Sequence, residues 1–144
     1  MRLSSLADYA IVLMADAAGA CGGTKLNATL LAQRTGLPLP TAQKLVGMLV
    51  KAELLRSGRG SGGGIRLARP AAAISLADII EAIEGPIALT QCIEHDRPDC
   101  AVGSRCRTSP HLARVNGLVR GALDDVKLSQ LADAPTGVAI KELA

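Results

Sequence analysis

The sequence predicts a mainly α-helical fold with one small β-hairpin and a long helix near the carboxyl end, and three observations predict it. The 144 residues are 49% hydrophobic but include one Tyr and no Phe or Trp, so the core must consist of aliphatic side chains on closely packed helices. Apolar residues recur at spacings of three and four along much of the chain. One glycine-rich stretch between short strand-like runs interrupts this pattern. The length suits one modest domain, or a small domain with a dimerisation arm.

The first predicted helix follows two serines, which can cap its start, and ends in "GACGG". Two further helices are expected at about residues 28–34 and 40–52, joined by the turn "TGLP". Gly36 can adopt the left-handed conformation that closes the earlier helix, and Pro40 suits the first turn of the later one. This arrangement is the outline of a helix-turn-helix, whose second helix enters the DNA major groove.

The glycine-rich stretch predicts the wing of a winged helix. Strand-like pieces at 54–57 and 65–68 flank it and form a β-hairpin. Its basic side chains are Arg56, Arg59 and Arg66, and an arginine at such a tip can enter the DNA minor groove. The glycines do not form a nucleotide-binding loop, because the Gly-Lys-Ser/Thr ending is missing.

Two more helices are expected after the wing. Ser75 and Asp78 form a capping-box start for "SLADIIEAIEG", which Gly85 ends. Farther along, apolar side chains form a seam with coiled-coil spacing: Leu112, Val115, Val119, Ala122 and Val126. On so short a chain this seam can bind a second copy, and a homodimer would match the two-fold symmetry of most helix-turn-helix operators.

The charge is unevenly distributed. Residues 1–70 carry nine Lys or Arg against three acids, about +6, and residues 71–144 carry seven against ten, about −3. A basic amino-terminal half is what a polyanion binder needs. We expect Thr41, Gln43 and Lys44 to contact bases and phosphates, and Arg59 to reach the minor groove. Other basic side chains are expected to contact the DNA backbone or only solvent: Arg2, Arg34, Lys51 and Arg56.

Three of the four cysteines and both histidines fall in one window, "QCIEHDRPDCAVGSRCRTSPH", from Gln91 to His111. The chain shows no signal peptide and no run long enough to span a membrane, so a cytoplasmic location is expected. Thiols normally stay reduced there, and clustered cysteines then indicate metal or redox chemistry more readily than a disulfide.

The order of these pieces, with the stretches "DYAIVL", "RTGLPLPT", "GPIALTQC" and "DCAVGSRC", resembles the bacterial winged-helix regulators that include IscR and the nitric-oxide sensor NsrR. The resemblance is strongest to regulators of SUF-type iron–sulfur cluster assembly and covers residues 1–131. It implies a winged helix-turn-helix DNA-binding domain at 1–86 and a cluster-binding loop with a long dimerisation helix at 87–131. Residues 132–144 would form a tail.

The resemblance also implies an iron–sulfur cluster held by Cys92, Cys100 and Cys106. Thiolates are soft, anionic donors to iron, and seven and five intervening residues let the loop fold around one centre. A 2Fe-2S cluster is slightly favoured, and 4Fe-4S is also compatible. Spacing alone would also allow zinc.

The fourth ligand remains open. IscR-like members carry a histidine three residues after the last cysteine, a position occupied here by Ser109. The candidates are His111, two residues farther on, and Asp8, which matches the position from which NsrR-like members supply a carboxylate from the partner subunit. His95, inside the loop, is a weaker third candidate.

The function implied is a homodimeric transcriptional regulator, expected to be a repressor, that binds double-stranded operator DNA. It would sense iron–sulfur cluster status and control SUF-type genes, with no membrane, small-molecule substrate or enzymatic activity involved. The serious alternative is a winged-helix regulator with a zinc, thiol-redox or nitric-oxide trigger. A small thiol enzyme or electron carrier is disfavoured, because no substrate pocket is suggested and a carrier has no use for a basic helix-turn-helix.

Overall fold

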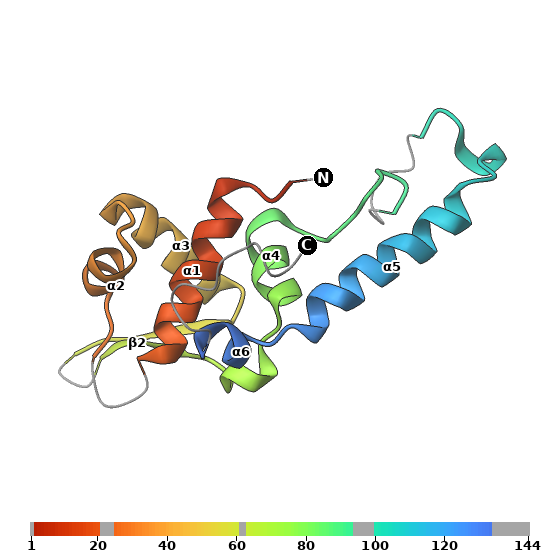
Figure 1. Cartoon of the computed structure of the whole chain (residues 1–144). Helices are drawn as coiled ribbons and strands as arrows, with labels where there is room; N and C mark the ends of the chain where they lie inside the picture. Colours follow the sequence, from red (N-terminus) through yellow and green to blue (C-terminus); the bar gives the residue numbers. More distant parts are fainter. Residues whose placement is uncertain (1, 21–24, 61–62, 94–99, 134–144) are drawn as a thin grey trace.

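A computed structural model describes residues 2–20, 25–60, 63–93 and 100–133 (Figure 1). The elements in these ranges, in chain order, are α1 (Ser5–Gly19), α2 (Ala28–Thr35), α3 (Leu39–Lys51), β1 (Leu55–Gly58), β2 (Gly64–Leu67), the 3-10 helix η1 (Ala71–Ala73), α4 (Leu76–Glu84), the 3-10 helix η2 (Gly103–Arg105), α5 (Ser109–Asp125) and α6 (Leu128–Ala132). The predicted fold class, a mainly helical winged helix-turn-helix, is confirmed.

The helix ends follow the local signals in the sequence. The Ser4 hydroxyl accepts the Ala7 N–H at 3.1 Å and caps α1, and Gly36 closes α2 with a left-handed φ of 75°. Ser75 and Asp78 form the expected capping box at the start of α4, with bonds of 3.1 and 2.9 Å. These side chains satisfy backbone groups that a helix end leaves unpaired.

The wing strands lie one residue away from the predicted positions, at Leu55–Gly58 and Gly64–Leu67 instead of 54–57 and 65–68. The reason is the end of α3: the Leu54 N–H donates to the Leu49 carbonyl at 2.9 Å. That bond closes the helix, with Glu53 in the left-handed region at φ 57°. Leu54 closes the helix through its N–H while its carbonyl accepts the Ala68 N–H at 3.0 Å, and the paired strand residues begin at Leu55 and end at Leu67.

Side chains of the four helices α1, α2, α3 and α4, of the wing and of α6 form one aliphatic core. Its largest fully buried apolar side chains are Leu13, Met14, Leu31, Leu45, Leu49, Leu54, Leu55, Ile74, Ile79 and Leu128. Full burial of each such side chain contributes about 1.5–3 kcal/mol. We call α1–α4, the wing and α6 the body.

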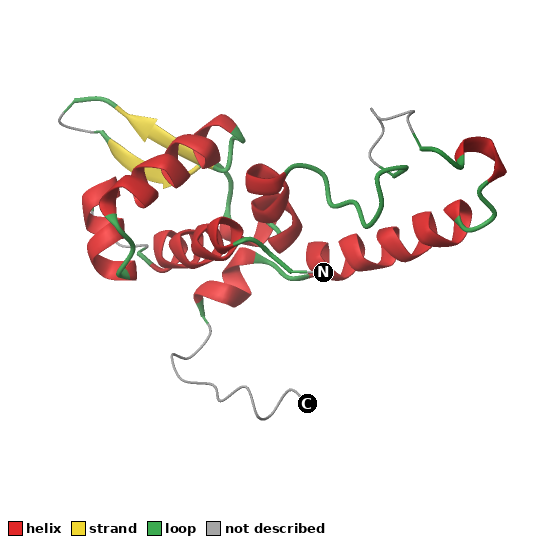
Figure 2. Ribbon diagram, turned by 90° about the horizontal axis from the view of Figure 1, so that it is seen from above, coloured by secondary structure: helices red, strands yellow, loops and turns green. Residues whose placement is uncertain are grey.

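The helix α5 leaves this body and projects from it (Figure 1). Figure 2 shows the segment after α4 running along α5 toward its far end. We call this segment and α5 the arm. Of the α5 side chains only Asn116 is buried, whereas Val115 and Leu118 are 45% and 66% exposed. None of the described helices is both long and apolar enough to cross a membrane.

The predicted apolar seam lies on α5 except for its last member. Val126 follows the helix in an extended conformation, because its carbonyl accepts the Leu76 N–H at 2.8 Å as the chain turns back to the body. An adjoining isolated bridge pairs Ser75 with Lys127. This return connection ends α5 and brings Leu128 of α6 into the core.

Candidate functional site

The helix α3 presents Gln43 and Lys44 on the side away from the apolar core. It begins after Pro38, with Pro40 in its first turn, and buries Ala42 and Leu45 toward the core. Gln43 and Lys44 are exposed, whereas Thr41 is half-buried. The orientation of α3 thus leaves Gln43 and Lys44 accessible to a ligand in front of it, and Thr41 less so.

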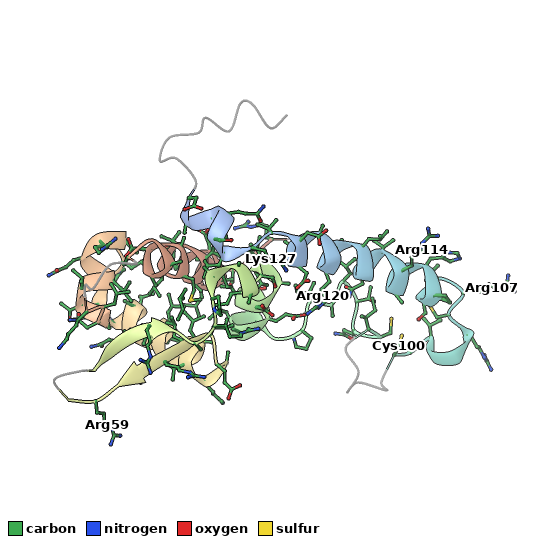
Figure 3. All side chains as sticks on the ribbon, turned by 90° about the horizontal axis from the view of Figure 1, so that it is seen from below. Arg59, Cys100, Arg107, Arg114, Arg120 and Lys127 are labelled. Atoms are coloured by element: carbon green, nitrogen blue, oxygen red, sulfur yellow. The ribbon has the colours of Figure 1, made fainter. Side chains whose placement is uncertain are left out.

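The wing that follows α3 is a tight antiparallel hairpin. A Cβ on Gly63 would lie 2.5 Å from the Gly58 carbonyl oxygen, so only glycine fits where the two strands approach. Arg59 follows β1 and is exposed, and Figure 3 shows it at the end of the hairpin, pointing away from the protein. The predicted placement of an arginine at the wing tip is therefore met.

An open groove of about 800 Å³ separates the end of α3 from the wing, and three arginines line it: Arg56, Arg66 and Arg69. Arg56 and Arg66 are direct partners in the β-ladder. Like charges at directly opposite positions destabilise a sheet. Arg69 is paired with Asp78 at 3.6 Å. The unfavourable Arg56–Arg66 pairing is explained if an anion such as a phosphate group lies against the wing.

Arg34 is exposed, and its side chain also makes a contact within the protein. Its guanidinium forms an ion pair with Asp16 at 2.9 Å, which ties α2 to α1. Sequence position alone could not show this, because the partner lies on another helix eighteen residues away.

The described part of the cysteine window lies on the arm. Cys92 is exposed, and Cys100 and Cys106 are half-buried; all three are free thiols. Figure 3 shows Cys100 beside α5, at the opposite end of the molecule from Arg59. The predicted DNA contacts and the predicted cysteine ligands thus occupy two different regions.

Hydroxyl groups contact two of the thiols. The sulfur of Cys92 lies 3.2 Å from Thr90 Oγ1, and that of Cys106 lies 3.3 Å from Thr108 Oγ1. The Thr108 hydroxyl, followed by the backbone N–H groups of Thr108 and Ser109 at the start of α5, lowers the pKa of the Cys106 thiol. Donors of this kind favour a thiolate, the form that binds metals and reacts with oxidants.

The predicted ligand set is not assembled among the described residues, where no three His, Cys, Asp or Glu side chains gather closely enough to hold a metal ion. His111 is exposed in the first turn of α5, and Asp8 is exposed in the first turn of α1. His95 lies outside the described residues. The donor chemistry fits an iron–sulfur cluster, with three uncrosslinked thiols on one arm, and their convergence would require the loop to rearrange.

A set of polar contacts at the base of the arm was not predicted. Asn116 is 7% exposed and bonds to the backbone of Ile87 and Leu89, and Arg120 pairs with Glu81. The Glu81 carboxylate raises the pKa of Arg120. The available signal was an Asn among the apolar residues of the α5 seam.

Comparison with known proteins agrees with this architecture. Residues 3–134 match the Rrf2 family, described as an iron-dependent transcriptional regulator. The chain belongs to the Rrf2 family. The regulator IscR of Vibrio atlanticus is 32% identical to it over 131 residues, which are 91% of this chain and 75% of that protein.

Solved structures of Rrf2-like regulators superpose on it. CymR, the global cysteine regulator of B. subtilis, gives a TM-score of 0.71 at 28% identity, covering 92% of this chain and 96% of CymR. IscR of T. potens gives 0.69 at 27% identity, covering 100% and 97%. This Rrf2 protein is therefore a DNA-binding transcriptional regulator of the IscR and CymR type, not an enzyme. The resemblance to IscR-type regulators is confirmed.

Proposed function

We propose that this Rrf2 protein is a homodimeric repressor whose affinity for a double-stranded operator depends on an iron–sulfur cluster held by Cys92, Cys100 and Cys106. The observation that carries the proposal is the presence of three free thiols on an arm attached to a winged-helix body. The family description and the likeness to IscR support iron as the metal.

The operator contacts would come from α3 and the wing. Gln43 and Lys44, with Thr41 behind them, would meet base edges and phosphates in the major groove, and Arg59 would enter the minor groove. Arg56 and Arg66 would neutralise backbone phosphates, which relieves their mutual repulsion. The DNA-binding domain would then be residues 1–86, the sensing part 87–131 and the tail 132–144.

The homodimer would form through the exposed apolar side of α5. Val115 and Leu118 are the large apolar side chains exposed on this helix. Val119 and Leu123 of the same helix line a groove of about 650 Å³ together with Leu3. Covering this surface with a second copy removes apolar area from water. It also places two wings for a two-fold operator.

When bound, the cluster would link the three thiolates. Oxidants, nitric oxide or iron shortage would break this link. The residues present would position and protect the cluster: the Thr90 and Thr108 hydroxyls lie within hydrogen-bonding distance of the Cys92 and Cys106 sulfurs, and the backbone N–H groups of Thr108 and Ser109 favour negative charge on Cys106. His111 or, from the partner subunit, Asp8 would complete the ligand set. SUF-type assembly genes are the proposed targets.

The test is anaerobic purification followed by visible absorption, iron and sulfide analysis, and DNA binding before and after cluster removal. A brown protein whose DNA affinity changes on cluster loss supports the proposal. Substitutions Cys100→Ser, His111→Ala and Asp8→Asn should then separate the ligands, because loss of a ligand lowers the iron content. A colourless protein, or DNA binding unchanged by cluster loss, contradicts it.

A thiol trigger is the second candidate, and the hydrogen-bonded Cys106 with its lowered pKa favours it. The similarity to CymR is compatible with this alternative. Treatment of the metal-free protein with hydrogen peroxide distinguishes the two. A thiol sensor changes DNA affinity reversibly with oxidation and dithiothreitol in the absence of metal, and a cluster sensor does not.

A further inference from the structure

The backbone that leads from α4 toward Cys92 is held by side chains of two helices. The Ile87 N–H donates to Glu81 Oε1 of α4 at 3.3 Å. The Ile87 carbonyl accepts from Asn116 Nδ2 of α5 at 2.9 Å, and the Leu89 N–H donates to Asn116 Oδ1 at 2.8 Å. This segment therefore has a fixed position three residues before the first predicted ligand.

Asn116 uses both ends of its side-chain amide in these bonds. A buried amide needs such partners, because an unpaired donor or acceptor away from water is costly. An apolar residue at this place would pack on α5 equally well but could not hold the two backbone groups. The choice of Asn within an apolar seam thus specifies one position of the segment along α5.

Arg120 lies one helical turn after Asn116 and completes the set. Its Nε and Nη2 atoms donate to the two carboxylate oxygens of Glu81, each at 2.9 Å. Such a fork of two bonds fixes direction as well as distance. Glu81 consequently joins α4, α5 and the Ile87 backbone, and α4 packs against α1 and α3 in the body.

We propose that Glu81, Asn116 and Arg120 form a clamp that transmits the state of the cysteine segment to the DNA-binding body, with Asn116 as the positioning residue. The inference rests on the proposed function, since it requires a ligand held by the thiols. A ligand that moves Cys92 pulls on Leu89, and the clamp passes this displacement to α5 and, through Glu81, to α4. Without the clamp, the segment after α4 would move without displacing α4 or α5.

The experiment uses the full chain, reconstituted anaerobically with ferrous iron and sulfide, and a DNA duplex selected by the wild-type protein from a randomised pool. The quantity measured is the coupling ratio, the Kd for this duplex without the cluster divided by the Kd with it. Iron content and hydrogen exchange of the Ile87 and Leu89 amides are measured on the same samples. Asn116→Ala and Arg120→Met are compared with Arg114→Met, a matched control at an exposed arginine on the same helix.

Asn116→Ala and Arg120→Met are expected to retain iron and to bring the coupling ratio to within about twofold of one, whereas typical coupling is about 5- to 150-fold. Faster exchange of the Leu89 amide in metal-free Asn116→Ala, relative to Arg114→Met, would show that the clamp itself has opened. A merely structural Asn116 would alter exchange and leave the ratio at the wild-type value, which overturns the proposal.

A second variant keeps the test decisive if Asn116→Ala does not fold. Asn116→Asp retains the acceptor for Leu89 and loses the donor to Ile87, so it should lower the coupling ratio at unchanged iron content. An unchanged ratio overturns the clamp. Failure of the proposed function looks different, because then the wild-type protein itself would hold no cluster or would show a ratio of one.

Discussion

The body and the arm of this Rrf2 protein are built in opposite ways. Every helix from α1 to α4 buries apolar side chains in one core. In the arm, the seventeen-residue α5 buries a single side chain, and that side chain is polar. A helix on its own gains little stability in water. The body can thus fold on its own contacts, while the arm depends on contacts from outside the chain's core.

Three helices of the body have a side-chain cap that α5 lacks, although α3, which follows Pro38, also starts without one. Ser4, Asn27 and Ser75 each accept a backbone N–H and cap their own helices. Thr108, at the start of α5, caps nothing with its side chain and instead contacts the Cys106 sulfur. A missing cap costs about 0.5–2 kcal/mol. The start of α5 therefore lacks the stabilisation of a side-chain cap, and the Thr108 hydroxyl instead stabilises the thiolate of Cys106.

The largest expected effect comes from replacing one leucine in the body and comparing the loss of stability with that of a leucine replaced in the arm. Leu45→Ala, at a fully buried site in the body, should lower the free energy of unfolding by about 2–5 kcal/mol. Leu118→Ala, on the exposed side of α5, should have little effect within one chain but should weaken self-association. Urea unfolding at two protein concentrations, with light scattering, measures both effects. Equal losses in the two variants, independent of concentration, would contradict the division into body and arm.

Glycine substitutions give the next largest effect. Gly63→Ala places a Cβ against the Gly58 carbonyl and should destabilise the wing by about 1–3 kcal/mol, with weaker DNA binding. Among the described residues, a Cβ at Gly117 meets no atom within 4 Å beyond its own stretch of helix, so Gly117→Ala should stabilise α5 by about 0.5–1 kcal/mol. Thermal unfolding shows whether the two substitutions change the stability in opposite directions. Destabilisation by Gly117→Ala would mean that a second copy packs closely against that part of the helix.

Substitution of Arg66 and of Arg34, both in the body, should change stability in opposite directions. Only the Arg66 substitution should change the salt dependence of DNA binding. Arg66→Met removes the repulsion with Arg56, so stability should rise by about 0.2–1 kcal/mol, while the salt dependence of DNA binding falls by about one unit of slope. Arg34→Met loses the pair with Asp16, so stability should fall by up to about 1 kcal/mol with the slope unchanged. Denaturant unfolding and DNA titrations at several salt concentrations test this. If the Arg66 variant kept the wild-type slope, the wing would not contact phosphate.

The sequence predicted the body well because its signals are local. Capping serines, a left-handed glycine and apolar spacing lie within a few residues of the element that they control. The strand positions were wrong by one residue, because Leu54 takes part in closing α3. That choice depends on the positive φ of Glu53, for which the residue type gives no warning.

The arm was predicted less completely because its contacts join distant parts of the chain. Asn116 is buried by a segment 27 and 29 residues away, so helical spacing could not show that it would lie inside. The pairing of Glu81 with Arg120 spans 39 residues. Spacing did predict an apolar α5 face, but whether the cysteines share one ligand depends on loop closure, which periodicity does not describe.

The smallest expected effect tests whether the Thr108 hydroxyl stabilises the Cys106 thiolate instead of capping α5. In the metal-free protein, Cys106 should react with iodoacetamide at a lower pH than an ordinary thiol, because the Thr108 hydroxyl and the first backbone N–H groups of α5 lower its pKa. Thr108→Val removes the largest cause of that shift, so the pKa should rise and the pH dependence of alkylation should move upward. Peptide mass spectrometry after timed alkylation measures each site. An unchanged Cys106 profile in Thr108→Val would show that the α5 backbone N–H groups alone support the thiolate, and that the Thr108 hydroxyl gives up its capping role without chemical consequence.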